Sequence, residues 1–188
     1  MGQYDRKTKY DRFWKLGQQA ARRCSKNITR EIEEKKAGLN SQFLTDSLNC
    51  LPHFLGCLAE NQLSDLVITQ FPSFFIANID SYYSKGSHWL AIGIFKDTIE
   101  IFDPLGFTIF NWNRIPCELL GFLQRMAVTR KVKVCPRIQS TESTFCGFYC
   151  IFYLILRMFI SFRKIYSYFH QLNSKLHQND HILLKFFK

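Results

Sequence analysis

The stretch HWLAIGIFKDTIEIFDP, residues 88–104, predicts the centre of the fold. Residues 88–95 are apolar on both faces of the expected strand, which is typical of a strand in the middle of a covered sheet. The polar triplet KDT supplies a hairpin turn, and IEIFD pairs back until the following proline ends the second strand. His88 opens the first strand and Asp103 closes the second, so the hairpin is expected to hold them close together.

Segments on either side of this hairpin predict further helices and strands. The expected elements are a helix over residues 41–51, a strand over 71–80, a helix over 119–128, a strand over 132–134 and a buried helix over 146–162. This mixture predicts an α+β fold in which a sheet packs on at least one long apolar helix.

The size and composition of the chain are those of one folded body. With 188 residues, 47% of them apolar, the chain can bury one sizeable core, and residues 41–188 are expected to form a single domain. Residues 1–40 are a basic, polar extension, predicted to be either a marginal helix or a flexible arm. Arg157 interrupts the longest apolar run, which argues against a membrane span.

The net charge of +10 is concentrated at the two ends of the chain. Residues 1–36 hold 11 Lys/Arg against 5 Asp/Glu, and residues 157–188 hold 6 against 1. Such ends could contact the phosphates of a nucleic acid, with an affinity that falls with salt, but a solvated helical surface and a loose basic tail explain them equally well. The internal candidates for a phosphate-facing patch are Arg125, Arg130, Lys131, Lys133 and Arg137, for which a solvated face is again the alternative.

Cysteine usage and the N-terminus indicate an intracellular protein. The N-terminal MGQYDRKTKYDRFWK lacks the apolar core of a signal peptide. The seven cysteines would then mostly remain thiols, and their odd number argues against a complete disulfide framework. Cys50, His53 and Cys57 superficially suggest a metal cluster, yet no second ligand pair follows at the spacing of a zinc finger, so no metal is expected.

Cys146 lies in QSTESTFCGFYC, residues 139–150, at the predicted start of the buried helix. The partial positive charge and unpaired N–H groups of a helix N-terminus favour a thiolate, which suits a nucleophile. Gly147 has no side chain that would crowd an approaching carbonyl group. Cys150, one turn further along, is expected to be a core thiol, and an inert buried thiol is the alternative for Cys146.

A cysteine nucleophile needs a base, an orienting acceptor and an oxyanion donor. His88 could be the base, and Asp103 the acceptor that holds its imidazole in one tautomer. Gln139, seven residues before Cys146, could aim its amide at the oxyanion. Each residue also has a structural alternative: a capped strand end for His88, a turn residue for Asp103 and a surface amide for Gln139.

The ordered set HW at 88–89, DPLGF at 103–107, QS at 139–140 and CG at 146–147 resembles the adenovirus-type cysteine endopeptidase (adenain) family. Related enzymes are encoded by Maverick/Polinton-like elements and other double-stranded DNA viruses, and the wider clan includes proteases of ubiquitin-like modifiers. The resemblance implies a papain-like fold, with a central mixed sheet packed on helices and the nucleophile at the N-terminus of a buried helix. The implied roles are nucleophile for Cys146, general base for His88, orienting carboxylate for Asp103, oxyanion-hole amide for Gln139 and site-lining residues for Trp89 and Gly147.

The same resemblance implies the reaction and the partners. Members of the family cleave peptide bonds after glycine, in hydrophobic-X-Gly-X or hydrophobic-X-Gly-Gly contexts, and mature virion precursor proteins. The expected partners are therefore protein substrates, with no required cofactor and with DNA and a short peptide as activators, for a monomer in the host nucleus or the virion. Two features depart from the family pattern: residues 1–40 lie outside its core, and Cys117 and Cys135 only bracket the place of the cysteine that would bond an activating peptide.

Two other functions fit parts of the pattern. A protease of ubiquitin-like modifiers would use the same triad but needs a surface for a folded modifier, and the short chain and the DPLGF context argue against it. A non-enzymatic, basic DNA-binding protein with a degenerate protease fold would not need the complete set of His88, Asp103, Gln139 and Cys146.

Overall fold

The computed structural model describes residues 4–24, 28, 30, 38–83, 87–106, 115–172 and 175–188. The helices are α1 (Tyr4–Cys24), α3 (Ser41–Leu48), α5 (Cys117–Ala127), α6 (Cys146–Arg157), α7 (Phe162–Leu172) and α8 (Asn179–Phe187). The strands are β1 (Phe54–Leu58), β2 (Ser73–Asn78), β3 (Trp89–Ile94), β4 (Thr98–Phe102) and β5 (Lys131–Val134). Short 3-10 turns cover Glu60–Gln62 and Leu176–Gln178.

The five strands form one mixed sheet in the order β1-β2-β3-β4-β5. The inner pairs β2–β3 and β3–β4 are antiparallel, whereas the outer pairs β1–β2 and β4–β5 are parallel. The predicted hairpin is therefore confirmed at the centre of the sheet, with Ala91 opposite Phe102. Its register brings the start of β3 and the end of β4 to the same edge.

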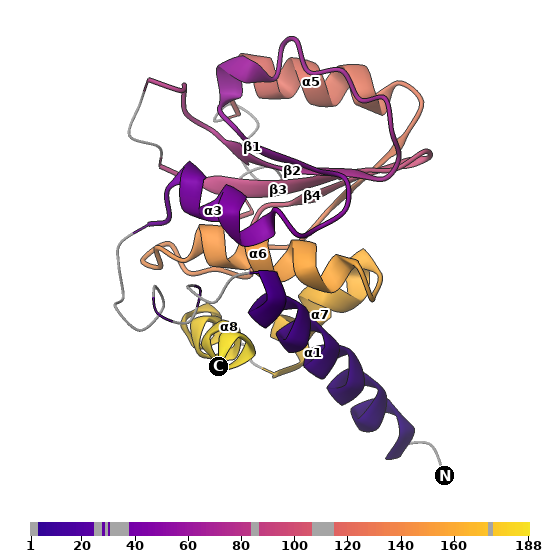
Figure 1. Ribbon diagram of the computed structural model, residues 1–188, viewed down its shortest axis with the longest axis vertical. Helices are drawn as coiled ribbons and strands as arrows, with labels where there is room; N and C mark the ends of the chain where they lie inside the picture. The colour runs from indigo at the N-terminus through magenta and orange to yellow at the C-terminus, as the bar shows by residue number, and fades with distance from the viewer. Residues whose placement is uncertain are drawn as a thin grey trace.

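Helices cover both faces of this sheet, which confirms the predicted α+β fold (Figure 1). Helix α5 packs on one face, where Phe122 lies edge-on to Phe75 with ring centroids 5.6 Å apart. Helix α6 covers the other face, and Tyr153 stacks on Phe102 of β4 at 4.6 Å. Because both faces are covered, the central strand β3 (WLAIGI) carries apolar side chains on both of its faces.

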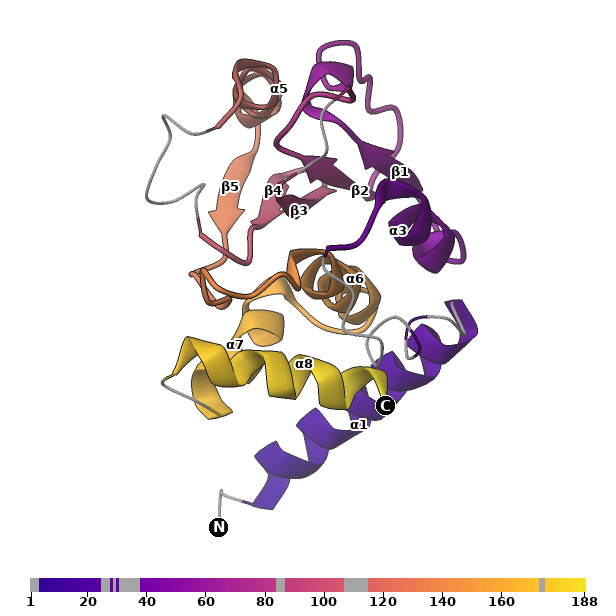
Figure 2. The same cartoon turned by 90° about the vertical axis from the view of Figure 1, so that its left-hand side faces the viewer.

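Helix α6 is buried on all sides, since α1, α7 and α8 form a further layer beneath it (Figures 1 and 2). The prediction of one helix over 146–162 was wrong in length, because α6 ends at Arg157 and α7 begins at Phe162. Arg157 donates from Nε to Oε2 of the buried Glu100 at 2.6 Å and from Nη1 to the Ile160 carbonyl at 3.2 Å. These contacts hold the chain in a turn where the helix would otherwise continue.

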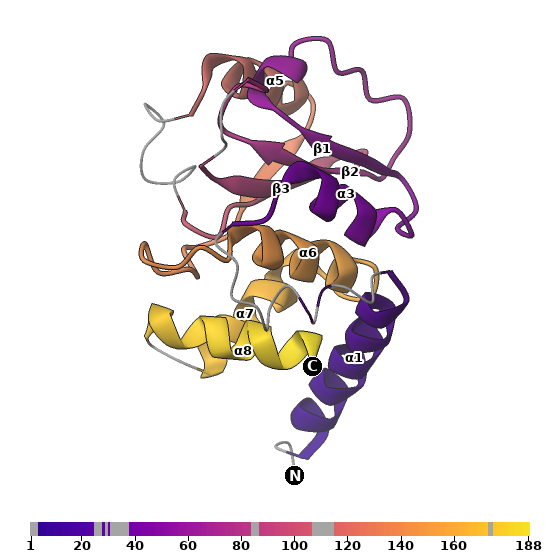
Figure 3. The ribbon, with the colours of Figure 1, turned by 60° about the vertical axis from the view of Figure 1, so that its left-hand side comes forward.

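The basic N-terminal segment contains helix α1, which packs against α6 and α8 (Figure 3). Trp14 is its main anchor, with ring contacts to Phe152, Tyr168 and Phe186 on α6, α7 and α8. Gly17 allows this close approach, because a Cβ there would meet the Phe186 ring at 2.8 Å. Apart from Ile28 and Arg30, residues 25–37 lie outside the described part of the chain.

Three further observations revise or extend the sequence predictions. The description of the C-terminal end as a loose tail was wrong, because Ile165, Phe169, Leu183 and Phe186 bury α7 and α8 in the core. Strand β1 was not predicted, since its FLGCL sequence shows no alternation. Among the described helices, none combines the length and apolar character needed to cross a membrane.

The cysteines are mostly thiols, as expected, with one exception. Cys24 at the end of α1 forms a disulfide with Cys50 after α3. The other five cysteines are unpaired: Cys57, Cys117, Cys135, Cys146 and Cys150. Within the described residues no group of three or more His, Cys, Asp or Glu side chains could hold a metal ion.

Candidate active site

His88 and Asp103 meet at the edge of the sheet where β3 begins and β4 ends. Asp103 Oδ1 lies 2.8 Å from His88 Nε2 and also accepts the Leu105 N–H at 3.1 Å. Both side chains are buried, with 2% of His88 and none of Asp103 exposed. The carboxylate thus fixes the Nε2 side of the imidazole.

Two neighbouring groups, Asp103 and Cys146, change the protonation of His88. Burial alone would lower the pKa of His88, but the hydrogen bonds and negative charges of Asp103 and Cys146 outweigh it and raise the pKa to about 9. The imidazole is therefore mainly protonated at neutral pH. A protonated imidazole beside a thiol is the arrangement that stabilises a thiolate.

Cys146 is the first residue of α6 and keeps 7% of its surface exposed. Its position exposes it to the N–H groups of the first helical turn, which favour negative charge. The missing side chain of Gly147 makes room for Leu39 and Leu44, whose atoms would lie 3.2 Å from a Cβ there. Cys150 is fully buried and burial raises the pKa of its thiol well above the usual range, which confirms it as a core residue.

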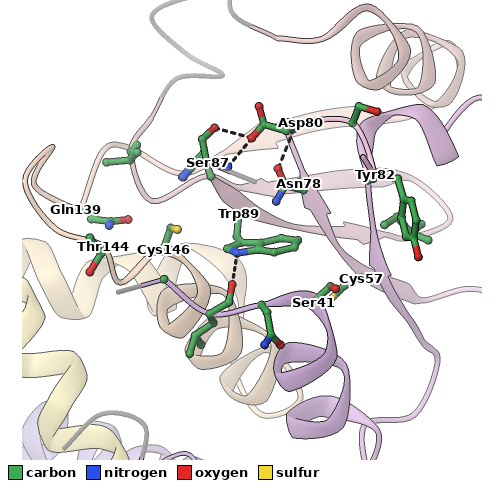
Figure 4. A pocket seen from close by; sticks show the side chains of 18 of the residues that line it. Ser41, Cys57, Asn78, Asp80, Tyr82, Ser87, Trp89, Gln139, Thr144 and Cys146 are labelled. Atoms are coloured by element: carbon green, nitrogen blue, oxygen red, sulfur yellow. Dashed lines mark hydrogen bonds between the residues drawn. The ribbon is translucent and has the colours of Figure 1, made fainter. Parts of the chain in front are cut away.

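Gln139 lies on the loop between β5 and α6 and lines the same cavity as Cys146 (Figure 4). Its backbone N–H donates to the Pro104 carbonyl at 2.9 Å, which ties the loop to the turn after β4. Its side-chain Nε2 donates to the Ser143 carbonyl at 2.8 Å. The same nitrogen also donates to the Ser143 hydroxyl oxygen at 3.2 Å, so a ligand at this position would replace the longer of the two bonds.

The site opens into a cavity of about 710 Å³. Gly147, which was expected to line the site, is not part of the cavity walls. They are formed by Gly38, Leu39, Asn40, Ser41, Cys57, Leu58, Ala59, Gln62, Asn78, Asp80, Ser81, Tyr82, Ser87, His88, Trp89, Leu105, Gln139, Thr141, Ser143, Thr144 and Cys146. The cavity therefore brings together His88, Gln139 and Cys146, while Asp103 lies behind the histidine. Trp89 is half-buried in the wall, where its Nε1 donates to the Leu39 carbonyl at 2.8 Å (Figure 4).

The segment Gly38–Ser41 was not predicted to belong to the site. Leu39 packs on Gly147 and accepts the hydrogen bond of the Trp89 indole, so this segment forms one wall of the cavity. The sequence AGLNS carries no catalytic or binding pattern that could have indicated this role. Its contacts depend on tertiary packing alone.

The five basic residues proposed as a phosphate-facing patch have different surroundings. Arg125 donates to the Leu63 and Ser64 carbonyls, and Arg130 donates to the Phe95 carbonyl. Lys131 is exposed on β5, and Lys133 lies on the same strand with Nζ 3.6 Å from Glu100 Oε1. Arg137 donates from Nε to the Gln139 carbonyl at 3.1 Å, which makes it part of the active-site loop.

Comparison with known proteins identifies the family. The sequence profile of the adenovirus endoprotease family matches residues 54–184, which contain His88, Asp103, Gln139 and Cys146. No curated protein sequence gives a match. The profile covers well over half of the chain, and the mixed sheet packed on helices is compatible with the papain-like fold of that family. The chain belongs to the adenovirus endoprotease family and is a cysteine protease.

Proposed function

We propose that this protein is an endopeptidase that cleaves after glycine, in hydrophobic-X-Gly-X or hydrophobic-X-Gly-Gly sites, and matures the precursor proteins of a virus or virus-like element. The observation that carries this proposal is the position of Cys146. It stands at the start of α6, in one cavity with His88, whose Nε2 is 2.8 Å from Asp103.

In the acylation step the Cys146 thiolate attacks the carbonyl carbon of the scissile peptide bond. A carbon–sulfur bond forms, and the carbonyl oxygen gains the electron pair of its π bond. The oxyanion receives hydrogen bonds from the Cys146 backbone N–H and the Gln139 amide. When the carbon–nitrogen bond breaks, the protonated His88 gives its proton to the leaving amine.

Deacylation uses the same residues in reverse. The now neutral His88 takes a proton from a water molecule, which attacks the thioester carbonyl and forms a second oxyanion. Collapse of this intermediate breaks the carbon–sulfur bond and releases the carboxylic acid product and the Cys146 thiolate. Asp103 keeps the imidazole oriented and its charge balanced throughout, because its hydrogen bond to Nε2 does not depend on the substrate.

The geometry of the cavity wall supports a preference for glycine. The Trp89 indole and Leu39 are held together by a hydrogen bond on the side of the cavity next to Cys146 (Figure 4). A rigid wall at this place limits the room for a side chain on the residue whose carbonyl is attacked, and glycine has none.

DNA stimulation is part of the same proposal. The exposed cations of α1 and α7 are suited to phosphate contacts: Arg12, Lys15, Arg23, Arg163 and Lys164. Binding through such residues would weaken steeply with salt. Affinity for DNA that is unchanged between low and physiological salt would contradict this part of the proposal.

The substrate proposal is tested with three substrates, each with and without DNA. These are a Leu-X-Gly-Gly-X peptide, the same peptide with alanine before the scissile bond, and a fusion to a folded ubiquitin-like modifier. We expect hydrolysis of the glycine peptide, stimulation by DNA, and a kcat/KM at least about 10-fold lower for the alanine peptide, since a side chain must displace the wall. Cleavage of the folded fusion alone would instead identify a protease of ubiquitin-like modifiers.

A further inference from the structure

The first two residues of α8 contact the loop that carries Gln139. Asn179 is 2% exposed, and its Nδ2 donates to the Ile138 carbonyl at 2.7 Å. That carbonyl belongs to the same peptide group as the Gln139 N–H, which donates to Pro104. One peptide group is thus held from both sides, by the turn after β4 and by α8.

Asp180, the next residue, joins the same loop to the nucleophile helix. Its Oδ1 accepts the hydroxyl of Tyr149 at 2.8 Å, and the nearby Ser143 side chain acts to lower the pKa of the carboxyl group. Ser143 is the partner of the Gln139 amide, whereas Tyr149 lies one turn after Cys146 on α6. The Asp180 carboxylate is therefore hydrogen-bonded to the cysteine helix through Tyr149 and is a neighbour of Ser143 on the glutamine side of the site.

Partial burial of the Asp180 carboxylate costs it part of its hydration. Burial raises the pKa of Asp180, and the hydrogen bonds from Tyr149 and Ser143 oppose that shift. Neither Asn179 nor Asp180 lines the cavity, so neither can touch a substrate bound there. Figures 2 and 3 show the loop before α6 lying over the start of α8, although the two segments are far apart in the sequence.

We propose that Asn179 and Asp180 are positioning residues that set the place of the Gln139 amide relative to Cys146. The C-terminal helix α8 is then part of the oxyanion side of the active site. This inference rests on the proposed function, in which Gln139 stabilises the oxyanion. It also assigns a role to a helix that follows the last recognisable motif of the chain.

The test uses two isosteric substitutions, Asn179→Asp and Asp180→Asn. The first replaces a donor with a carboxylate that repels the Ile138 carbonyl, and the second removes an acceptor from the Tyr149 and Ser143 pair. We expect kcat for the glycine peptide to fall about 10- to 100-fold with KM nearly unchanged, because a displaced oxyanion donor acts only in the transition state. Lys185→Ala, at an exposed position of the same helix, is the matched control and should keep wild-type kcat.

A second readout separates positioning from general loss of structure. Alkylation of Cys146 by iodoacetamide needs the thiolate but forms no oxyanion, so its rate constant should be unchanged in both variants. In combination with Gln139→Ala, neither substitution should lower kcat further. Fully additive losses, or alkylation that slows in parallel with kcat, would overturn the inference.

The same experiments distinguish failure of the proposed function from failure of the positioning role. If wild type does not cleave the peptide at all, the proposed function fails. If wild type cleaves it and both variants have full kcat, only the positioning role fails. Should the α8 variants not fold, Ser143→Ala removes the loop hydroxyl that accepts from the Gln139 amide and neighbours Asp180, and it must then show the selective loss of kcat with unchanged alkylation.

Discussion

The two halves of the active site are held together in different ways. His88 directly precedes β3 and Asp103 directly follows β4, the neighbouring antiparallel strand, and the two residues are 15 positions apart. Gln139 lies on a loop whose position depends on Pro104 and on Asn179, which is 41 residues from the carbonyl that it holds. The proposed base is therefore positioned by local strand pairing, and the proposed oxyanion donor by contacts between distant segments.

This difference has a consequence for how each half responds to change. The hairpin half of the site, which holds His88 and Asp103, is covered by the core on both faces. A substitution there should therefore change the chemistry of the site without changing the backbone conformation. The loop that carries Gln139 is anchored by the backbone carbonyl of Pro104 and by the side chain of Asn179. The effects of substitutions in the hairpin and in the loop should consequently differ in magnitude and in which kinetic parameter they change.

The largest effect is expected at Asp103. Asp103→Asn keeps the shape of the side chain but removes the charge and favours the wrong tautomer of His88, so kcat should fall about 10⁴-fold. Steady-state hydrolysis of the glycine peptide measures this loss. Asp97→Asn, in the exposed turn of the same hairpin, is the matched control, and equal activity in the two variants would remove Asp103 from the mechanism.

A smaller loss is expected at Gln139. Gln139→Ala removes one oxyanion donor while the Cys146 N–H remains, so kcat should fall about 10²- to 10³-fold with little change in KM. The exposed Gln124→Ala on α5 controls for the loss of an amide side chain. A change confined to KM would mean that Gln139 binds substrate rather than the transition state.

The smallest effect concerns stability. The pKa of His88 is raised from 6.5 to about 9 by Asp103 and Cys146 against the opposing effect of burial, so folding favours the protonated imidazole. The contribution of the protonated His88 to the free energy of unfolding is complete below pH 6.5 and is lost as the pH rises through about 9. The difference in unfolding free energy between wild type and His88→Asn should therefore shrink over this range in denaturant titrations. A difference that grows with pH would contradict the ion pair.

The sequence predicted most of the hairpin half because its signals are local. Apolar runs, a polar turn and a terminating proline indicate β3 and β4, and strand pairing alone brings His88 to Asp103. The start of α6 was equally accessible, since Cys146 precedes a long apolar run. The end of α6 was not, because the Glu100 partner that holds Arg157 lies on another strand.

The rest of the site depends on contacts that no local pattern encodes. Leu39 joins the cavity wall because it packs on Gly147, and Asn179 reaches the loop because α8 folds back under α6. The C-terminal segment carries many basic residues, yet its buried aromatic face against Trp14 decides its placement. A loose tail, one of the explanations that the charge composition left open, is wrong because this segment packs as helices α7 and α8.

The central claim is that Cys146, and not Cys150, is the nucleophile of a protease. The most direct test compares Cys146→Ala with Cys150→Ala in hydrolysis of the Leu-X-Gly-Gly-X peptide, with folding checked by thermal unfolding. We expect Cys146→Ala to be inactive and Cys150→Ala, which removes a fully buried thiol, to keep activity close to wild type. Equal activity in wild type and Cys146→Ala would contradict the account.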